Sequence, residues 1–214
     1  MAVNTTQNVA PPSLPVSGPS YDRSAQEQYS NVLRLFFNRL VSIVNAVTGT
    51  RGGQYINNPY GAIQRTTDVT FTANTATQVT FNVNDYLNGC TNDGTDGIHV
   101  AQSGIYNYQF SVQFANTDSQ IHAAYIWLRK NGVDIPGTGS KWDITAKHGS
   151  SDGYVIAAAN FYVELAAGDT VEMWAAVDNA AVYMESYAAA TSPFARPSIP
   201  SVVATLSFVS SVLP

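Results

Sequence analysis

One short motif in the sequence has the pattern of a catalytic serine. Residues 149–153 read Gly-Ser-Ser-Asp-Gly, which fits the Gly-x-Ser-x-Gly nucleophile elbow with Ser151 at its centre. That elbow needs a strand before the serine and a helix after it, because the tight turn lifts the hydroxyl above the sheet. From Tyr154 onward, β-branched and aromatic residues predict a strand instead. We therefore interpret the motif as a glycine-flanked hairpin loop, with His148 as a loop histidine, and expect no enzyme.

The three histidines do not have the spacing of a local metal site. His99, His122 and His148 are widely separated along the chain, whereas structural zinc ligands occur as close pairs. Convergence of one histidine from each of three copies on a symmetry axis stays open as an alternative. For His122, inside a predicted strand, we favour a half-buried polar role.

Residues 92–97, Asn-Asp-Gly-Thr-Asp-Gly, superficially resemble a calcium loop. Oxygen ligands at alternate positions suit Ca²⁺, but the distal bidentate glutamate of an EF-hand is absent. Asp93 and Asp96 are therefore candidates for a weak Ca²⁺ site, and a plain Asp-Gly turn is the favoured interpretation. We expect no other cofactor.

Four aromatic residues are candidates for ligand stacking or for a subunit interface: Trp142, Trp174, Tyr183 and Tyr187. Aromatic side chains are enriched in both settings, because they combine a large apolar surface with a polar tip. We favour packing in an interface and keep sugar stacking as the alternative.

The composition excludes several classes of protein. Charged residues make up 12% of the 214 residues, the net charge is −5, and there are three lysines against seven arginines. Nucleic-acid binders and membrane-surface proteins need clustered basic residues, so both classes are excluded. A single cysteine, Cys90, excludes an internal disulfide. The start lacks a signal-peptide pattern and no run of 18 apolar residues occurs, so we expect folding in a host cytoplasm.

The N-terminal part of the chain divides into an arm and a helix. Residues 1–20 are rich in proline without hydrophobic periodicity, which predicts an extended arm. Residues 21–48 predict an amphipathic helix, capped by Asp22 or by a Ser24–Glu27 capping box. Its seam follows heptad spacing: Tyr29, Leu33, Phe36, Leu40, Ile43 and Val47. This wide apolar face packs either on the chain's own body or, as we favour, in a bundle of helices from several copies.

After a turn-rich linker over residues 49–65, the pattern is typical of strands. Apolar residues from Tyr106 to Phe114 alternate strictly with polar ones, and an Asn-Gly pair at 131–132 predicts a hairpin turn. Tyr154–Leu165 is apolar at both parities, so we expect it in the middle of a sandwich or between subunits. Eight to ten short strands without intervening helices predict a mainly β sandwich or jelly roll.

Four segments, taken in order, resemble the complement C1q and tumour necrosis factor superfamily. They are Gly104–Ser111, Trp127–Gly132, Leu165–Glu172 with its Leu-x-x-Gly-Asp-x-Val pattern, and Val202–Phe208. The resemblance covers residues 66–214 and implies a ten-stranded jelly-roll knob that associates as a homotrimer. The chain lacks the Gly-X-Y collagen stalk of the animal members, so their plasma role is not implied.

The upstream half resembles virion structural proteins of tailed phages, both decoration and fibre proteins. The resemblance rests on Tyr21-Asp22-Arg23, the Gln/Glu-rich helix and the segments Gly52–Tyr55 and Asn58–Ala62. It implies a bacteriophage structural protein located in the virion, a capsid decoration, head-fibre or short-spike homotrimer. Residues 1–20 would mount it on capsid or tail proteins. The alternative is a tail-fibre or secreted-type trimeric module for host attachment that binds a host surface glycan or receptor.

Overall fold

The computed structural model describes residues 12–16, 20–48, 58–95 and 97–210. Contacts divide the chain into one unit over residues 1–57 and a second over residues 58–214. Among the described residues, no helix has both the length and the apolar composition that crossing a membrane requires.

The first unit contains the helix α1 (Arg23–Thr48), close to the predicted 21–48. Asp22 caps it, because its Oδ1 accepts the backbone N–H of Ser24 at 2.9 Å. The alternative capping box does not form, since Ser24 lies inside the helix and Glu27 pairs with Arg23 at 2.8 Å. In the predicted arm, residues 12–16 and 20 form neither helix nor strand. Its other residues lie outside the described part of the chain.

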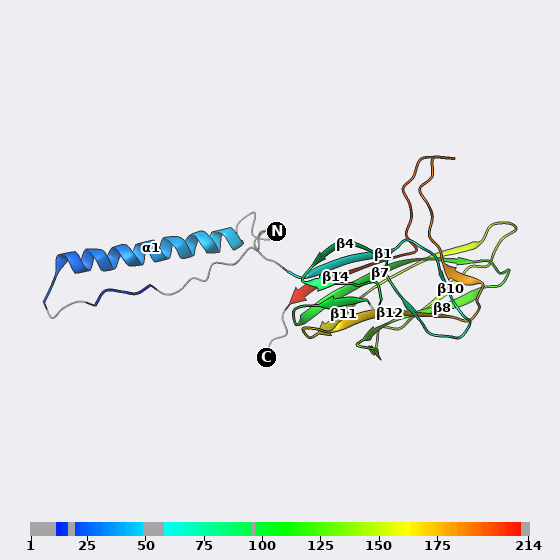
Figure 1. Cartoon of the computed structure of the whole chain (residues 1–214), viewed down its shortest axis with the longest axis horizontal. Helices are drawn as coiled ribbons and strands as arrows, with labels where there is room; N and C mark the ends of the chain where they lie inside the picture. The colour runs from blue at the N-terminus through cyan, green and yellow to red at the C-terminus, as the bar shows by residue number, and fades with distance from the viewer. Residues whose placement is uncertain (1–11, 17–19, 49–57, 96, 211–214) are drawn as a thin grey trace. The chain divides into compact units, whose positions relative to one another are not determined.

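The second unit is a sandwich of two antiparallel sheets, as predicted (Figure 1). The first sheet has the order β4-β1-β14-β7-β11, with β13 and β2 continuing beside the end of β7. Its strands are β1 (Tyr60–Arg65), β2 (Val69–Thr70), β4 (Val83–Asn88), β7 (Gly104–Asn116), β11 (Gly153–Leu165), β13 (Val182–Met184) and β14 (Val202–Ser210).

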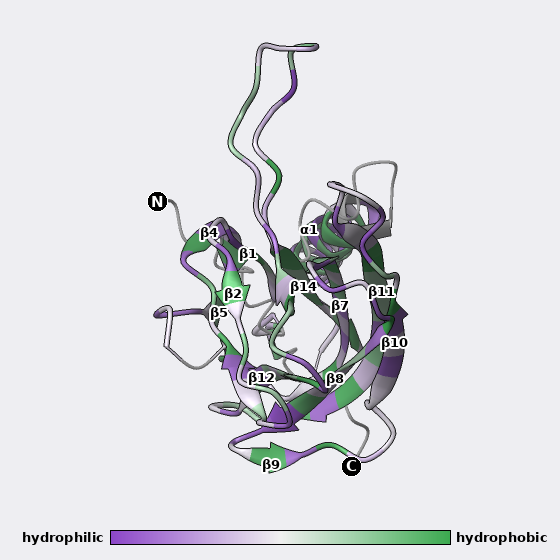
Figure 2. Ribbon diagram, turned by 90° about the vertical axis from the view of Figure 1, so that its right-hand side faces the viewer, coloured by the Kyte–Doolittle hydropathy of each residue, from purple (hydrophilic) through white to green (hydrophobic). Residues whose placement is uncertain are grey.

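The second sheet has the order β10-β8-β12-β6-β5, with β3 beside β12 and β9 beside β8. Figure 2 shows β8 and β12 on the side of the sandwich opposite β1, β14 and β7. Its strands are β3 (Thr77–Val79), β5 (Cys90–Thr91), β6 (Ile98–Val100), β8 (His122–Lys130), β9 (Val133–Asp134), β10 (Ser140–Ile144) and β12 (Thr170–Val177).

The resemblance implies ten strands, whereas the described residues form fourteen. Six of these are only two or three residues long, as β2, β5 and β9 illustrate. Short pairings of this kind arise where turns and irregular segments interrupt a longer extended path, and alternation of polar and apolar residues does not reveal them.

The core lies between the sheets and follows the predicted alternation. On β7, every second residue from Tyr106 to Phe114 is at most 4% exposed. The β8–β9 hairpin also follows its prediction: Asn131 and Gly132 have φ values of 51° and 79°, as a type I′ turn requires. Cys90 belongs to this core, and burial raises the pKa of its thiol to about 11.

The predicted linker over residues 49–65 ends too late. Residues 49–57 lie outside the described part, but Tyr60–Arg65 form β1, which pairs with both β4 and β14. Turn-forming residues dominate the local sequence, and the partner strand β14 is the last strand of the chain, so local pattern alone hides β1.

A two-stranded arm projects from the sandwich between β13 and β14 (Figures 1 and 2). Backbone bridges join Tyr187 to Ile199 and Ala190 to Arg196. The Arg196 guanidinium lies 5.4 Å from the centre of the Tyr187 ring, and Phe194 near the tip is exposed.

Candidate functional site

The Gly-x-Ser-x-Gly motif forms a turn that leads into a strand. The backbones of His148 and Ser151 bond to each other in both directions, and β11 begins at Gly153. A helix does not follow the serine, so the geometry of a nucleophile elbow is missing and the loop interpretation is confirmed.

The histidines have separate partners. His122 contacts Asp118 through Nε2 at 2.8 Å and Asp178 through Nδ1 at 3.3 Å. His99 Nδ1 lies 2.7 Å from the hydroxyl of Thr170. Among the described residues, no group of three or more histidine, cysteine, aspartate or glutamate side chains is placed to hold a metal ion.

The candidate calcium loop forms a turn at its first aspartate. Asp93 Oδ1 accepts the N–H of Thr95 at 2.9 Å and its hydroxyl at 2.6 Å, and these bonds hold the pKa of Asp93 below its ordinary value. Asp96 lies outside the described residues. The Ca²⁺ site therefore stays a prediction.

The four candidate aromatic residues separate into three environments. Trp142 packs against the core, and its Nε1 donates to the Ser140 hydroxyl at 3.2 Å. Tyr183 and Tyr187 come together at Glu185, to which the Tyr187 hydroxyl donates at 2.5 Å. Burial raises the pKa of both tyrosines above the ordinary value.

Trp174 lies on the outward face of the second sheet, under an arginine. The Arg129 guanidinium lies 3.8 Å from the centre of the Trp174 ring, so a cation already occupies this ring. Arg129 is held there by Asp134, whose Oδ1 accepts its Nε–H at 2.6 Å. This bond, together with one from Trp127, lowers the pKa of Asp134.

Beside this stack lies an open hollow of 460 Å³ on the same sheet. We call it the aromatic hollow, and it is lined by Tyr125, Ile126, Trp127, Gly139, Ser140, Lys141 and Ala176. The aromatic candidates of the sequence analysis omit Tyr125 and Trp127. Their separation by two residues within a strand is the signal that could have found them, because it puts both rings on one face.

The outward face of the first sheet has a different character. Strand register places thirteen residues in three adjacent rows, and none of them carries a charge. We call this the uncharged face: Tyr60, Ala62, Gln64, Tyr86, Asn107, Gln109, Ser111, Ala158, Asn160, Tyr162, Val203, Thr205 and Ser207. Two charged residues lie at its edges: Asp85 accepts a hydrogen bond from Gln64 at 2.6 Å, and Glu164 is exposed on the same side of β11 as Tyr162.

Strand β11 forms one edge of this sheet and alternates between buried and exposed residues. Tyr154, Ile156 and Tyr162 are 51%, 61% and 67% exposed. The prediction of a strand in the middle of the sandwich is therefore wrong, because one side of β11 faces outward. The alternative, that this strand lies between subunits, stays a prediction.

Many apolar side chains of α1 are exposed or only half-buried. Of the predicted seam, Tyr29 is exposed and Leu33, Phe36, Leu40 and Ile43 are half-buried, while the side chain of Val47 lies outside the described part. Further apolar residues on α1 are exposed: Leu35, Phe37, Val41 and Val44.

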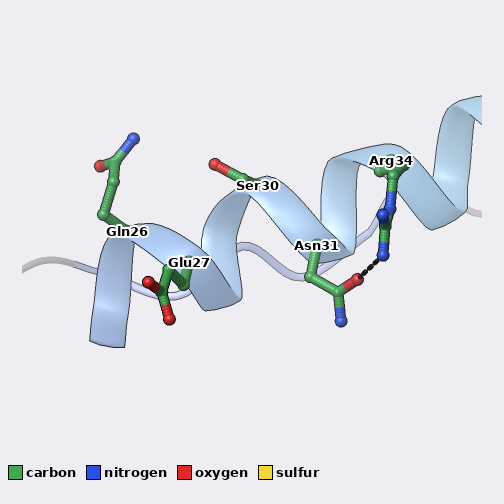
Figure 3. Close-up of a pocket in the computed structure, with 5 residues that line it drawn as sticks. All are labelled: Gln26, Glu27, Ser30, Asn31 and Arg34. Atoms are coloured by element: carbon green, nitrogen blue, oxygen red, sulfur yellow. Dashed lines mark hydrogen bonds between the residues drawn. The ribbon is translucent and has the colours of Figure 1, made fainter. Parts of the chain in front are cut away.

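A polar hollow of 310 Å³ follows the N-terminal half of α1. Figure 3 shows the five residues that line it, Gln26, Glu27, Ser30, Asn31 and Arg34, all from this one helix. Arg34 Nη2 donates to Asn31 Oδ1 at 2.8 Å. We interpret it as the solvated stripe of an amphipathic helix.

Comparison with protein-family models and with curated proteins finds no match. Among solved structures, the chain is similar to the globular domain of zebrafish complement 1qA protein. The match has 11% sequence identity and a TM-score of 0.42, and it spans 72% of this chain and 99% of that domain.

Proposed function

We propose that this chain is a non-enzymatic structural protein of a tailed-phage virion that acts as a homotrimer. The jelly-roll knob would point outward, and the N-terminal arm would mount it on the particle as a capsid decoration, head fibre or short spike. The single observation that carries the trimer is the uncharged face of the first sheet.

The uncharged face has the composition of a subunit interface. Protein interfaces lose charged residues at their centre and gain tyrosine, and this face contains Tyr60, Tyr86 and Tyr162 among amide and hydroxyl side chains. A solvated sheet face normally carries lysine and glutamate. The other sheet follows that rule, since Arg129 and Lys141 lie on its outward face.

Closure of three copies through this face would also protect the sheet. Its edge strands β4 and β11 expose backbone groups to which another chain could pair, and closed symmetry covers such edges. The number three follows from the resemblance of the strand motifs to a trimeric superfamily.

The helix supports the same assembly. Its 26 residues would span about 39 Å, the length of a short spike rather than a long fibre. Its exposed apolar residues would be buried in a bundle of three helices. The virion location is supported by the resemblance of residues 21–62 to phage structural proteins. Triplicate display would raise weak contacts to useful avidity.

The native mass in solution tests the trimer. The monomer is 22.9 kDa, so light scattering on a sizing column is expected to give three times that mass, about 69 kDa. Gln109→Lys places three like charges in the uncharged face and is expected to lower the mass. The matched control, Gln78→Lys, lies on the outward face of the other sheet and is expected to keep it.

A monomeric wild-type protein, or a Gln109→Lys variant of unchanged mass, would overturn the proposed interface. The virion location is tested separately, by mass spectrometry of purified particles from the source of the sequence. Absence of the chain from those particles would overturn the structural role.

A further inference from the structure

The aromatic hollow presents two rings whose orientation is set by the sheet. Tyr125 and Trp127 are neighbours on the outward face of β8, about 6.8 Å apart along the strand. Trp127 Nε1 donates to Asp134 Oδ1 at 2.8 Å, which fixes the plane of the indole. One ligand can therefore rest on both rings without reorganising them.

The floor of the hollow is open because its residues are small. Ala176 pairs with Tyr125 across β8 and β12, so a single methyl group lies beside that ring. A Cβ added at Gly139 would meet no atom within 4 Å. The volume of 460 Å³ lies within the usual range of about 300–1,000 Å³ for small-molecule sites.

The cations around the hollow are already paired. Lys141 Nζ lies 3.0 Å from Asp143 Oδ1, and Arg129 Nε lies 2.6 Å from Asp134 Oδ1. Each positive charge thus has a carboxylate beside it. An anionic ligand would have to compete with these carboxylates, so the site favours a neutral ligand that offers both donors and acceptors.

We propose that the aromatic hollow binds a neutral saccharide. The C–H face of a sugar ring packs on the faces of Tyr125 and Trp127, as apolar surface packs on any aromatic ring. The hydroxyl groups at the ring edge reach Lys141, which lines the hollow. Trp174 does not take part, because the Arg129 guanidinium lies 3.8 Å from the centre of its ring; the same guanidinium is 5.9 Å from the centre of the Trp127 ring.

A second copy of the chain is a poorer occupant of this face. Buried interface centres lose charge, whereas Arg129, Lys141 and Asp143 surround the hollow. The inference goes beyond the proposed structural role. It does not depend on the trimer, because all residues of the hollow belong to one chain.

The test uses the full chain and a panel of neutral and sulfated di- to hexasaccharides built on glucose, galactose and mannose. We expect a neutral saccharide of the panel to bind and to change the tryptophan fluorescence. Calorimetry is expected to give one site per chain. Trp127→Ala and Tyr125→Ala are each expected to weaken this binding by about tenfold or more. Ala176→Leu, which retains both rings, is expected to do the same by filling the floor.

The matched control is Phe194→Ala, which removes an exposed aromatic ring from the projecting arm and is expected to leave affinity unchanged. Native mass and circular dichroism are compared for every variant. Binding of sulfated members alone, no binding at all, or equal affinity of wild type and Ala176→Leu would each overturn the proposal. A monomeric protein with intact saccharide binding would overturn only the proposed trimer.

Discussion

At the scale of single residues, Asp169 shows how one carboxylate joins two turns. Its Oδ2 accepts the N–H of Ala166 at 2.8 Å, and its Oδ1 accepts from Asn131 Nδ2 at 2.7 Å. These hydrogen bonds, with Lys130 nearby, hold the pKa of Asp169 below its ordinary value. The residue thus ties the β11–β12 turn to the β8–β9 hairpin.

Asp169→Asn is expected to lower the free energy of unfolding by about 1–2 kcal/mol at neutral pH, because hydrogen bonds to a charged acceptor are the stronger ones. The folded pKa is lower than the unfolded one, so the carboxylate's contribution is complete above its ordinary pKa of 3.8. It is lost as the pH falls through the lower folded value.

Urea unfolding of both proteins between pH 2 and pH 7, at one protomer concentration, measures this gap. The control is Asp143→Asn, an exposed partner of Lys141. A gap that is constant across the whole pH range would show that the Asp169 charge plays no part.

The candidate residues show what a sequence pattern can and cannot reveal at this scale. Ser151 can be placed in a turn, because the strand pattern that follows it is local. The position of Arg129 over the Trp174 ring cannot be predicted in this way, because it depends on the pairing of β8 with β12, two strands that are far apart in the sequence. The shared face of Tyr125 and Trp127 can be predicted from the sequence, since strand alternation alone puts both residues on one side.

At the scale of elements, the strands with strict alternation are predictable and the ones with distant partners are not. Strand β7 and the β8–β9 hairpin follow from period-two patterning and an Asn-Gly turn. Strand β1 has the local pattern of a linker. It is a strand because it pairs with β14, and its own residues do not indicate that pairing. Strand β11 has the pattern of a central strand, because its outward side also carries apolar residues, among them Tyr154, Ile156 and Ala158.

The helix α1 is expected to need its apolar face covered. A helix of this length is marginal alone in water, and most helical stability comes from burial of one face. Phe36→Glu places a charge in the seam and is expected to remove most of the helical signal at 222 nm, with the trimeric mass retained through the uncharged face.

The matched control is Asn38→Glu, an exposed polar position on the same helix, which is expected to keep the helical signal. Far-ultraviolet circular dichroism of the full chain measures both variants. If Phe36→Glu is as helical as Asn38→Glu, the seam is not the face that α1 buries.

At the scale of the whole molecule, the chain consists of two units that the sequence separates by composition. The β unit over residues 58–214 has its own core of buried residues from both sheets. The unit over residues 1–57 contributes the helix. The junction is predicted less well: glycine, asparagine and proline gather there and predict a linker over residues 49–65, whereas the second unit begins at residue 58 and β1 at Tyr60.

Removal of residues 1–57 is expected to leave the β unit folded and still trimeric, because the core and the uncharged face both lie in residues 58–214. Light scattering and near-ultraviolet circular dichroism measure the result. A folded monomer would show that the helix, rather than the sheet face, holds three copies together.

The buried thiol described above makes this protein convenient for spectroscopic labelling. Only the thiolate reacts with maleimides, and a pKa of about 11 together with burial keeps Cys90 protonated and inaccessible near neutral pH. Because Cys90 is the one cysteine of the chain, a cysteine engineered at an exposed position would be the sole reactive thiol. Fluorophore pairs or spin labels could then report distances between the protomers of the proposed trimer, with the core of the protein untouched.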